Sequence, residues 1–589
     1  MAQRIQSPTT APCRVGRSGH FSGCSVALSA LIMSLTACGG GSGGSDPSLA
    51  ATPSAVDPGK VSTATPINGT NAARLAEQAA FGATPALLAS IESRGSGWID
   101  DQLSIRTSNY SALAAVSTDA STTCPSSGSA TCFRDNYTAF PVQLQFFQNA
   151  ISGLDQLRQR VALAYSQIFV VSSSTLMPAY AIRNYQQALL DNVFGNFRQM
   201  LTAISLSPTM GSFLNMVNND KGDASTSVRP NENYARELLQ LFTIGPHLLN
   251  TDGTPVLQAG QRVPAYSQVT VEGFAKVFTG WTYPTPSGDS GAARFNRTPW
   301  FNGPMIPVAS QHDTGSKALL NSVVLAPGGT ARADLDGALD NVFNHPNVGP
   351  FLGKQLIQFL VTSNPSPAYV ARVAAVFNDD GKQVRGNMGA VVKAILMDTE
   401  ARGNTATNSN FGKLREPVVD VTAVLRAMGG RSDGEYPNYV AYLMGQPLFG
   451  AGTVFNFYPP NFPLPKSTSM VAPQFGILNT SSASARLNFV SAVVYAPMGL
   501  VFAADPTVPG SIGTTVDLSA YTAAAGGGVD SLIQRLNTDL LQGRLSPTET
   551  STIATAVNAI PGSAQQLALE RARSAAYLVL ASPAYQVTR

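Results

Sequence analysis

The chain has few charged residues for its length. Only 12% of its 589 residues are Asp, Glu, Lys or Arg, and the formal net charge is +3. Lys and Arg are scattered rather than gathered into a stripe, so the electrostatic footprint of a nucleic-acid-binding protein is missing. We therefore expect no nucleic-acid partner. Apolar residues at 44% and aromatic residues at 8% are normal for a globular protein with a buried core.

Histidine and the common cofactor motifs are also scarce. The four histidines, at positions 20, 247, 312 and 345, show neither H-x-H nor H-x-x-x-H spacing, which argues against a dedicated zinc site. No C-x-x-C-H motif is present, which excludes covalently attached c-type haem. The Gly-rich run at 39–44 lacks the Lys-Ser/Thr of a phosphate-binding loop. The sequence therefore identifies neither a metal nor a cofactor.

The N-terminus lacks an apolar run long enough to cross a bilayer. Three arginines precede "SVALSALIMSL" at 25–35, which is shorter than the about 20 residues that a membrane span needs. This pattern predicts a secretory signal peptide over residues 1–37. "LTAC", ending at Cys38, resembles a bacterial lipobox, in which the Cys is lipidated and becomes the mature N-terminus. The alternative is an ordinary signal peptide that happens to contain a Cys.

The lipobox reading implies a location. Two or three acyl chains on one Cys anchor a protein stably, where one chain is marginal. Gly39 rather than Asp follows Cys38, which in a Gram-negative cell implies sorting to the outer membrane. We therefore expect an exported protein held at the outer membrane by the lipid on Cys38.

The five cysteines then divide simply. Cys13 and Cys24 leave with the signal peptide, Cys38 carries lipid, and Cys124 and Cys132 remain. These two flank a polar loop, "PSSGSAT", in an oxidising compartment, so we expect a local disulfide between Cys124 and Cys132. The alternative, a metal site, lacks further Cys and an adjacent His.

The rest of the chain reads as mostly helical. Residues 38–70 are rich in Gly, Ser and Pro and predict a flexible tether. Thr84-Pro85 and Ser207-Pro208 are helix starts, and the apolar spacing in 269–278 predicts another helix. Asp252-Gly253 predicts the turn of a short hairpin. We expect a mainly α fold: a large multi-helix body over 71–589 with long surface loops and at most a small β-hairpin.

Several motifs together resemble one bacterial family. They include "AARLAEQAAFGATPALLASI", "RPNENYARELLQLFTIG", "VEGFAKVFTGW", "HDTG", "GKLREPV" and the terminal "LASPAYQVTR", and from about residue 71 onward they look like the family catalogued as domain of unknown function 1800. The resemblance implies an exported protein with no settled activity. It also implies a possible partner, because genes of this family commonly neighbour those of an exported phosphatase- or sulfatase-like protein. His247 departs from the family pattern and is not carried over as a site.

The segment "RPNENYARELLQLFTIG" concentrates charge in a charge-poor chain. On a helical wheel Glu232, Arg236 and Glu237 share one face, opposite an apolar face that includes Tyr234 and Phe242. Three readings stay open: a solvated face with a Glu232–Arg236 ion pair, a buried structural knot, and a site. In the site, Glu232 and Glu237 would be acid/base groups or metal ligands, and Arg236 would bind an anion. Tethering of the loop 218–223 by Arg236 belongs to the second reading.

A second candidate lies in the loop "ASQHDTGSK". His312 and Asp313 are adjacent residues of types that serve as bases or metal ligands, so we include both as candidate catalytic residues. His345 precedes Pro346, and we expect a helix entry or a core hydrogen bond there. Aromatic-Pro stretches at 278–286 and 455–465 read either as packing over the core or as a platform for sugar or peptide.

Two functions follow from these observations. The first is a lipid-anchored envelope protein that binds or assembles with an exported phosphatase- or sulfatase-like protein, or with a surface polymer. The alternative is a hydrolase or transferase that acts on an envelope or extracellular polymer through Glu232, Arg236, Glu237 and His312.

Overall fold

The computed structural model describes residues 65–589, except 176, 224, 226, 289–290 and 404–409. The predicted signal peptide, Cys38 and most of the predicted tether lie outside the described residues. Residues 62–589 form one compact unit, and within it the first helix begins at Thr70.

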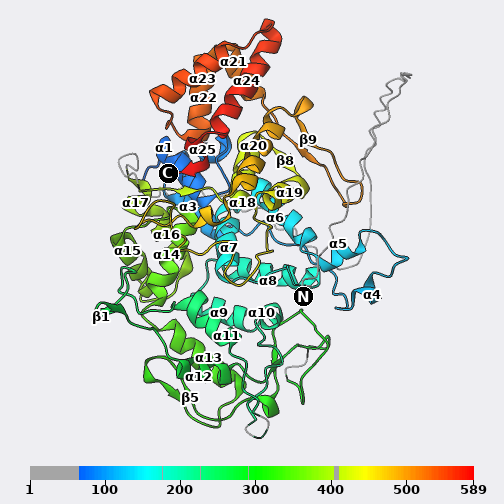
Figure 1. Cartoon of the computed structure of the whole chain (residues 1–589), viewed down its shortest axis with the longest axis vertical. Helices are drawn as coiled ribbons and strands as arrows, with labels where there is room; N and C mark the ends of the chain where they lie inside the picture. The colour runs from blue at the N-terminus through cyan, green and yellow to red at the C-terminus, as the bar shows by residue number, and fades with distance from the viewer. Residues whose placement is uncertain (1–64, 176, 224, 226, 289–290, 404–409) are drawn as a thin grey trace, which may run out of the picture. The chain divides into compact units, whose positions relative to one another are not determined.

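The fold is mainly α, as the sequence predicted. The described residues form 25 α-helices, and 52% of these residues are helical (Figure 1). The first eleven are α1 (Thr70–Ala79), α2 (Pro85–Arg94), α3 (Gly97–Ser104), α4 (Ala120–Thr123), α5 (Cys132–Tyr137), α6 (Phe140–Ser152), α7 (Gln156–Ile168), α8 (Ala179–Asn192), α9 (Phe197–Ser205), α10 (Pro208–Phe213) and α11 (Asn233–Glu237). The others are α12 (Gln268–Val277), α13 (Ala331–Phe343), α14 (Val348–Leu360), α15 (Pro367–Asn378), α16 (Met388–Met397), α17 (Thr399–Arg402), α18 (Pro417–Ala427), α19 (Glu435–Leu443), α20 (Thr480–Val494), α21 (Ser519–Gly526), α22 (Val529–Leu541), α23 (Pro547–Asn558), α24 (Ala564–Leu580) and α25 (Pro583–Gln586).

Helix starts follow local capping chemistry. The Thr84 hydroxyl accepts from the Leu87 N–H, with Pro85 as the first helical residue of α2. The helix predicted over 269–278 is α12, where the Ser267 hydroxyl accepts from the Thr270 N–H. These side chains satisfy N–H groups that have no partner within the helix. The predicted helix starts at Pro85 and Pro208 are confirmed.

Strands are short and lie in small antiparallel sheets. The four two-stranded sheets and one three-stranded sheet of the described residues are β1 (Leu257–Gln258) with β2 (Gln261–Arg262), β3 (Trp281–Thr282) with β4 (Ile306–Pro307), β5 (Lys317–Ala318) with β6 (Val324–Leu325), β7 (Lys413–Leu414) with β11 (Val587–Thr588), and β8 (Arg431–Ser432)–β10 (Thr514–Thr515)–β9 (Leu500–Phe502). These sheets exceed the single hairpin that the sequence suggested. At the predicted turn, Leu249 forms an isolated bridge with Pro255, and the regular hairpin β1–β2 follows a few residues later.

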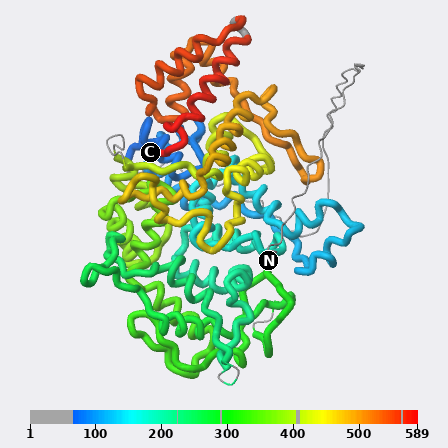
Figure 2. Tube along the Cα trace, in the orientation of Figure 1, coloured from blue at the N-terminus to red at the C-terminus, as the bar shows by residue number. Residues whose placement is uncertain are grey.

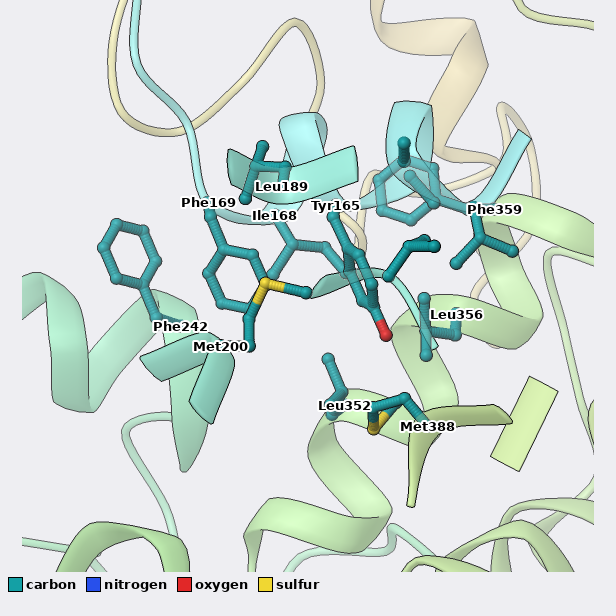
Figure 3. Packing of buried hydrophobic residues seen from close by; sticks show 14 of the residues in the cluster. Tyr165, Ile168, Phe169, Leu189, Met200, Phe242, Leu352, Leu356, Phe359 and Met388 are labelled. Carbon is teal, nitrogen blue, oxygen red and sulfur yellow. The ribbon is translucent and has the colours of Figure 1, made fainter. Parts of the chain in front are cut away.

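The main core surrounds α7. Tyr165 and Phe169, near the end of α7, pack among apolar side chains from several helices, including Met200 of α9 and Leu352 of α14 (Figure 3). The rings of Phe169 and Phe242 meet edge to face with centroids 5.7 Å apart. A second apolar cluster joins α18, α20 and the C-terminal helices, which form the orange and red part of the trace (Figure 2). A third, smaller cluster contains Tyr180, Tyr283 and Phe301, so the described part of the chain is one unit with two large apolar clusters and a small one.

Two further features bear on the sequence predictions. Cys124 and Cys132 form the expected disulfide, with Cα atoms 5.6 Å apart, and Cys132 is the first residue of α5. Among the described residues, no helix combines the length and apolar character that a membrane span requires.

Candidate functional site

The first sequence-predicted group lies on α11 and is partly exposed. Arg236 donates to Glu232 at 2.6 Å, and their side chains are 41% and 27% exposed. The Gln268 amide of α12 donates to both Glu232 oxygens at 3.0 and 3.1 Å. The loop at 218–223 is tied to this region by Asn219, whose side-chain oxygen accepts from the Asn231 N–H at 2.8 Å. Arg236 is therefore half of a surface ion pair rather than the centre of a buried knot.

Glu237 ends α11 in a different environment. The helix continues as a π-helix, Leu238–Thr243, instead of the plain α-helix expected from the wheel. Burial raises the pKa of Glu237, and Arg236 opposes this shift. Its Oε2 is shielded from solvent and accepts no hydrogen bond from a described residue. Tyr234, Leu238, Leu239 and Phe242 are buried as the wheel predicted.

His312 is buried inside a separate group. Its Nε2 lies 2.9 Å from Asp334 Oδ2, and its Nδ1 lies 3.0 Å from the Thr279 carbonyl oxygen. Lys317 Nζ is 2.7 Å from the same Asp334 oxygen. Asp313 Oδ1 accepts a hydrogen bond from the Gly315 N–H at 2.8 Å. Both ring nitrogens of His312 thus contact groups of the chain itself, which is the arrangement of a packing residue.

The structure does not join the two sequence-predicted groups by contact. Among the described residues, no hydrogen bond or ion pair links His312 or Asp313 to Glu232, Arg236 or Glu237. The described residues also contain no cluster of three or more His, Cys, Asp or Glu with the spacing to hold a metal ion. His345 is buried, and its Nδ1 accepts from the Asn347 N–H at 3.1 Å. Burial, followed by the charge of Arg385, lowers the pKa of His345 to about 4.

The family-like motif "GKLREPV" builds an ionic network in the interior. Glu416 is fully buried; its Oε2 accepts from Gln167 and Gln446, both at 2.8 Å, and from Tyr458 at 3.0 Å. Arg160 contacts its Oε1 at 3.3 Å. Although burial pushes the pKa of Glu416 upward, Arg160, Lys413 and the amide hydrogen bonds hold it below its usual range. The chain itself saturates this carboxylate, so no bonding capacity is left for a ligand.

A more open site lies along α19. We call it the α19 groove, a hollow of about 510 Å³ lined by Phe140, Gln143, Glu435, Asn438, Tyr439, Tyr442, Pro447 and Phe502. Tyr439 and Tyr442 are 55% and 61% exposed. Glu435, Tyr439 and Tyr442 are spaced i, i+4 and i+7, which places them on one face of the helix. Two aromatic rings and a carboxyl group therefore line the same surface.

Backbone contacts fix the position of α19 against α6. Gly434, the residue before the helix, has φ +95°, and a Cβ there would lie 2.3 Å from the Leu144 carbonyl oxygen. The Asn438 amide donates to Gln143 Oε1 at 3.1 Å across the two helices. The opposite wall is held by Tyr436, whose ring stacks on Phe502 with centroids 5.5 Å apart. The groove is thus built from rigid elements.

The electrostatic environment of the groove is acidic. Burial raises the pKa of Glu435, and the charges of Asp505 and Asp433 raise it further against the opposing charge of Arg134. Arg134 pairs with Asp135 at 2.7 Å and with Asp505 at 3.7 Å. Glu435 forms no ion pair with any described residue, and its Oε2 is shielded without a hydrogen bond. This carboxyl group is the one ionisable acid in the groove lining.

A larger hollow, of about 610 Å³, lies beside α8 and α9. Two of its polar side chains are already engaged. Asn184 donates to the Phe301 carbonyl at 3.1 Å and to Asn302 at 2.7 Å. Arg332 pairs with Asp336 at 2.7 Å. Volume alone does not make a site, and specificity needs polar groups that are free to bind. We favour the smaller α19 groove, because two exposed tyrosines line it together with Glu435, which forms no ion pair with a described residue.

Sequence reasoning missed this groove. The aromatic stretches at 278–286 and 455–465, which the sequence suggested instead, differ in exposure. Phe278, Trp281 and Tyr283 are buried, while Phe455 is 54% exposed. The available signal was "EYPNYVAYL", in which Tyr439 and Tyr442 follow Glu435 on one helical face. Its partners Phe140 and Phe502 come from distant parts of the chain, so the sequence alone does not show the cavity.

A family model described as "Protein of unknown function (DUF1800)" matches residues 74–587, nearly the whole chain. Neither a curated protein nor a solved structure matches. The family description names no reaction or ligand.

Proposed function

We propose a function from the surface of this chain, because the chain belongs to the DUF1800 family, whose description names no activity. The protein is a lipid-anchored envelope protein that binds a surface saccharide polymer in the α19 groove. The observation that carries the proposal is the pair of tyrosines, Tyr439 and Tyr442, which stay more than half exposed along one wall of a groove.

The groove chemistry suits a hydroxyl-rich chain molecule. Tyrosine offers an apolar ring face together with a polar hydroxyl, a combination that suits binding surfaces with one apolar and one hydrated side. Three residues of α-helix rise about 4.5 Å, so the two rings form successive stacking platforms rather than one closed pocket. The acceptor oxygens of Glu435 and Asn438 lie in the same lining and can receive hydrogen bonds from hydroxyl groups.

The anchoring part of the proposal rests on the sequence around Cys38. Replacing Cys38 with Ser should move the protein from the membrane to the soluble fraction of fractionated cells. Persistence of the Cys38→Ser variant in the membrane fraction would count against a lipid anchor. Association with an exported phosphatase- or sulfatase-like protein remains a proposal that co-purification of the full chain would test.

Polymer binding is tested by calorimetric titration with defined saccharide hexamers, namely those of glucose, N-acetylglucosamine and glucosamine. We expect binding to at least one of them, weakened about tenfold for each ring removed in Tyr439→Ala and Tyr442→Ala, since an aromatic contact contributes about 0.5–1.5 kcal/mol beyond its buried area. Tyr495→Ala is the matched control, because Tyr495 is 40% exposed and lies outside the groove. Absence of binding to all three hexamers, or equal loss in the control, would refute the proposal.

A hydrolase or transferase acting through Glu232, Arg236, Glu237 and His312 stays the second prediction. We place it behind polymer binding because both ring nitrogens of His312 contact groups of the chain. Glu237, with its raised pKa, is the member of this set that best keeps an acid/base role open.

A further inference from the structure

We propose that the α19 groove selects saccharide polymers that carry protonated amines, and that Glu435 is the residue that recognises the amine. This inference rests on the proposed function and names its ligand class. It assigns an ionic role to the one carboxyl group in the groove lining.

The first argument is charge complementarity. Three carboxylates, those of Glu435, Asp433 and Asp505, act on this end of α19 together with one guanidinium, that of Arg134. Arg134 is shared between Asp135 and Asp505, and its terminal nitrogens also donate to Thr507 at 2.9 Å. Glu435 is thus left without a positive partner among the described residues. A ligand cation would supply one.

Asp433 and Asp505 differ from Glu435 in their bonding. Asp433 Oδ2 accepts from the Ser511 hydroxyl at 2.6 Å and from the Ile512 and Gly513 N–H groups at 3.0 and 2.7 Å. Asp505 Oδ1 accepts from the Thr507 N–H at 2.8 Å. These two carboxylates organise the loop behind the groove and add to its negative potential. Glu435 is the one that belongs to the groove lining, and its Oε2 accepts no hydrogen bond from a described residue.

The second argument is the aromatic lining. Phe140, Tyr439, Tyr442 and Phe502 line the groove together with Glu435, and the faces of such rings attract cations. The groove rim already contains one such contact, in which the Arg134 guanidinium lies 4.6 Å from the centre of the Phe140 ring. Aromatic faces combined with a carboxylate form a recognised surface for ammonium groups. A polyanion, by contrast, would meet three negative charges of like sign.

The experiment compares two hexamers of the same length, one of glucosamine and one of N-acetylglucosamine, by calorimetric titration of the full chain. The titrations are run at a pH at which the amine is protonated and Glu435 is ionised. We expect the amine hexamer to bind about tenfold more tightly, because a charge-assisted hydrogen bond is roughly twice as strong as a neutral one. Glu435→Gln should abolish this preference, because it should weaken binding of the amine hexamer more than binding of the N-acetyl hexamer. Added salt should weaken only the amine hexamer in the wild type.

A matched variant separates site recognition from general attraction between charges. Asp530→Asn removes an exposed carboxylate on α22 that is not part of the groove lining, and it should keep the amine preference. Equal affinity for both hexamers in the wild type would overturn this inference while leaving polymer binding intact. Equal loss of preference in Asp530→Asn and Glu435→Gln would overturn it as well. Failure of both hexamers and of the glucose hexamer would refute the proposed function itself.

Discussion

Glu416 and Glu435 stand at the starts of consecutive helices, α18 and α19, and meet opposite surroundings. Glu416 is fully buried and accepts hydrogen bonds from Gln167, Gln446 and Tyr458 in addition to its contact with Arg160. Glu435 lines an open groove and has no ionic partner among the described residues. The pKa of Glu416 is lowered, whereas that of Glu435 is raised.

The difference separates a structural acid from a candidate binding acid. A buried charge is tolerated when the chain supplies its partners, and removing one partner leaves the other uncompensated. A carboxyl group left without partners at the surface slightly destabilises the free protein. Its interactions become more favourable when a ligand supplies the missing partners. Such local costs are characteristic of binding sites. Both acids lie near other charged groups, but only Glu416 has an ion pair and hydrogen-bond donors from the described residues.

The largest expected effect comes from Glu416→Gln. This change leaves Arg160 and Lys413 buried beside a neutral group, so we expect a loss of about 3–5 kcal/mol in the free energy of unfolding. The lowered pKa gives the sign with pH: the stabilisation is present above the ordinary pKa of Glu and disappears as pH falls through the folded-state pKa. Urea unfolding near neutral pH and in acid checks both statements. A deficit that stayed constant with pH would show that ionisation of Glu416 is irrelevant.

Gly434→Ala should have the next largest effect. A Cβ there would clash with the Leu144 backbone, and φ of +95° is strained for a residue other than Gly, so we expect a loss of about 1–3 kcal/mol. Hexamer binding should weaken in the same variant, because α19 must shift away from α6. Gly452→Ala is the control, since a Cβ at Gly452 meets no atom within 4 Å. If the Gly434→Ala protein were destabilised but bound the hexamer unchanged, the groove would not depend on the contact between Gly434 and Leu144.

Glu435→Gln should act in the opposite direction from Glu416→Gln. Burial and two nearby carboxylates raise the pKa of Glu435. Ionisation of this group therefore costs folding stability, and the cost is fully present above the raised pKa. The variant should therefore melt at a slightly higher temperature than the wild type near neutral pH. The difference should vanish in acid, below the ordinary pKa of Glu, where both states hold the proton. Thermal melts at the two pH values measure this, and a lower melting temperature near neutral pH would contradict it.

Arg236→Ala should have the smallest effect. Its ion pair with Glu232 is partly exposed, and such pairs contribute about 0.2–1 kcal/mol. Urea unfolding should detect a loss within that range. A loss of several kcal/mol would restore the reading of this segment as a structural knot.

Features set by neighbouring residues were predictable from the sequence. Thr84 and Ser267 cap the helices that follow them, because a cap depends on groups only two or three residues away. The disulfide between Cys124 and Cys132 and the buried face with Tyr234 and Phe242 were predictable for the same reason.

Features that depend on distant contacts were not predictable. Nothing near His312 in the sequence reveals that Asp334 and Lys317 enclose it. The π-helix after Glu237 was not predictable, because the spacing of its apolar residues also fits a regular α-helix. The α19 groove joins α6, α19 and β9, so no local pattern defines it. Packing between distant segments decided which carboxyl groups were left without partners.

The close approach of α6 and α19 has one further consequence. At Gly434 the separation of the two walls is determined by main-chain atoms rather than by the side chains that line the cavity. We therefore expect substitutions of Tyr439, Tyr442 and Phe140 to leave the separation of α6 and α19 at Gly434 unchanged. The two helices therefore form a binding surface whose backbone spacing is fixed. Related proteins or designed variants can acquire new ligand preferences on it through a few substitutions on one helical face.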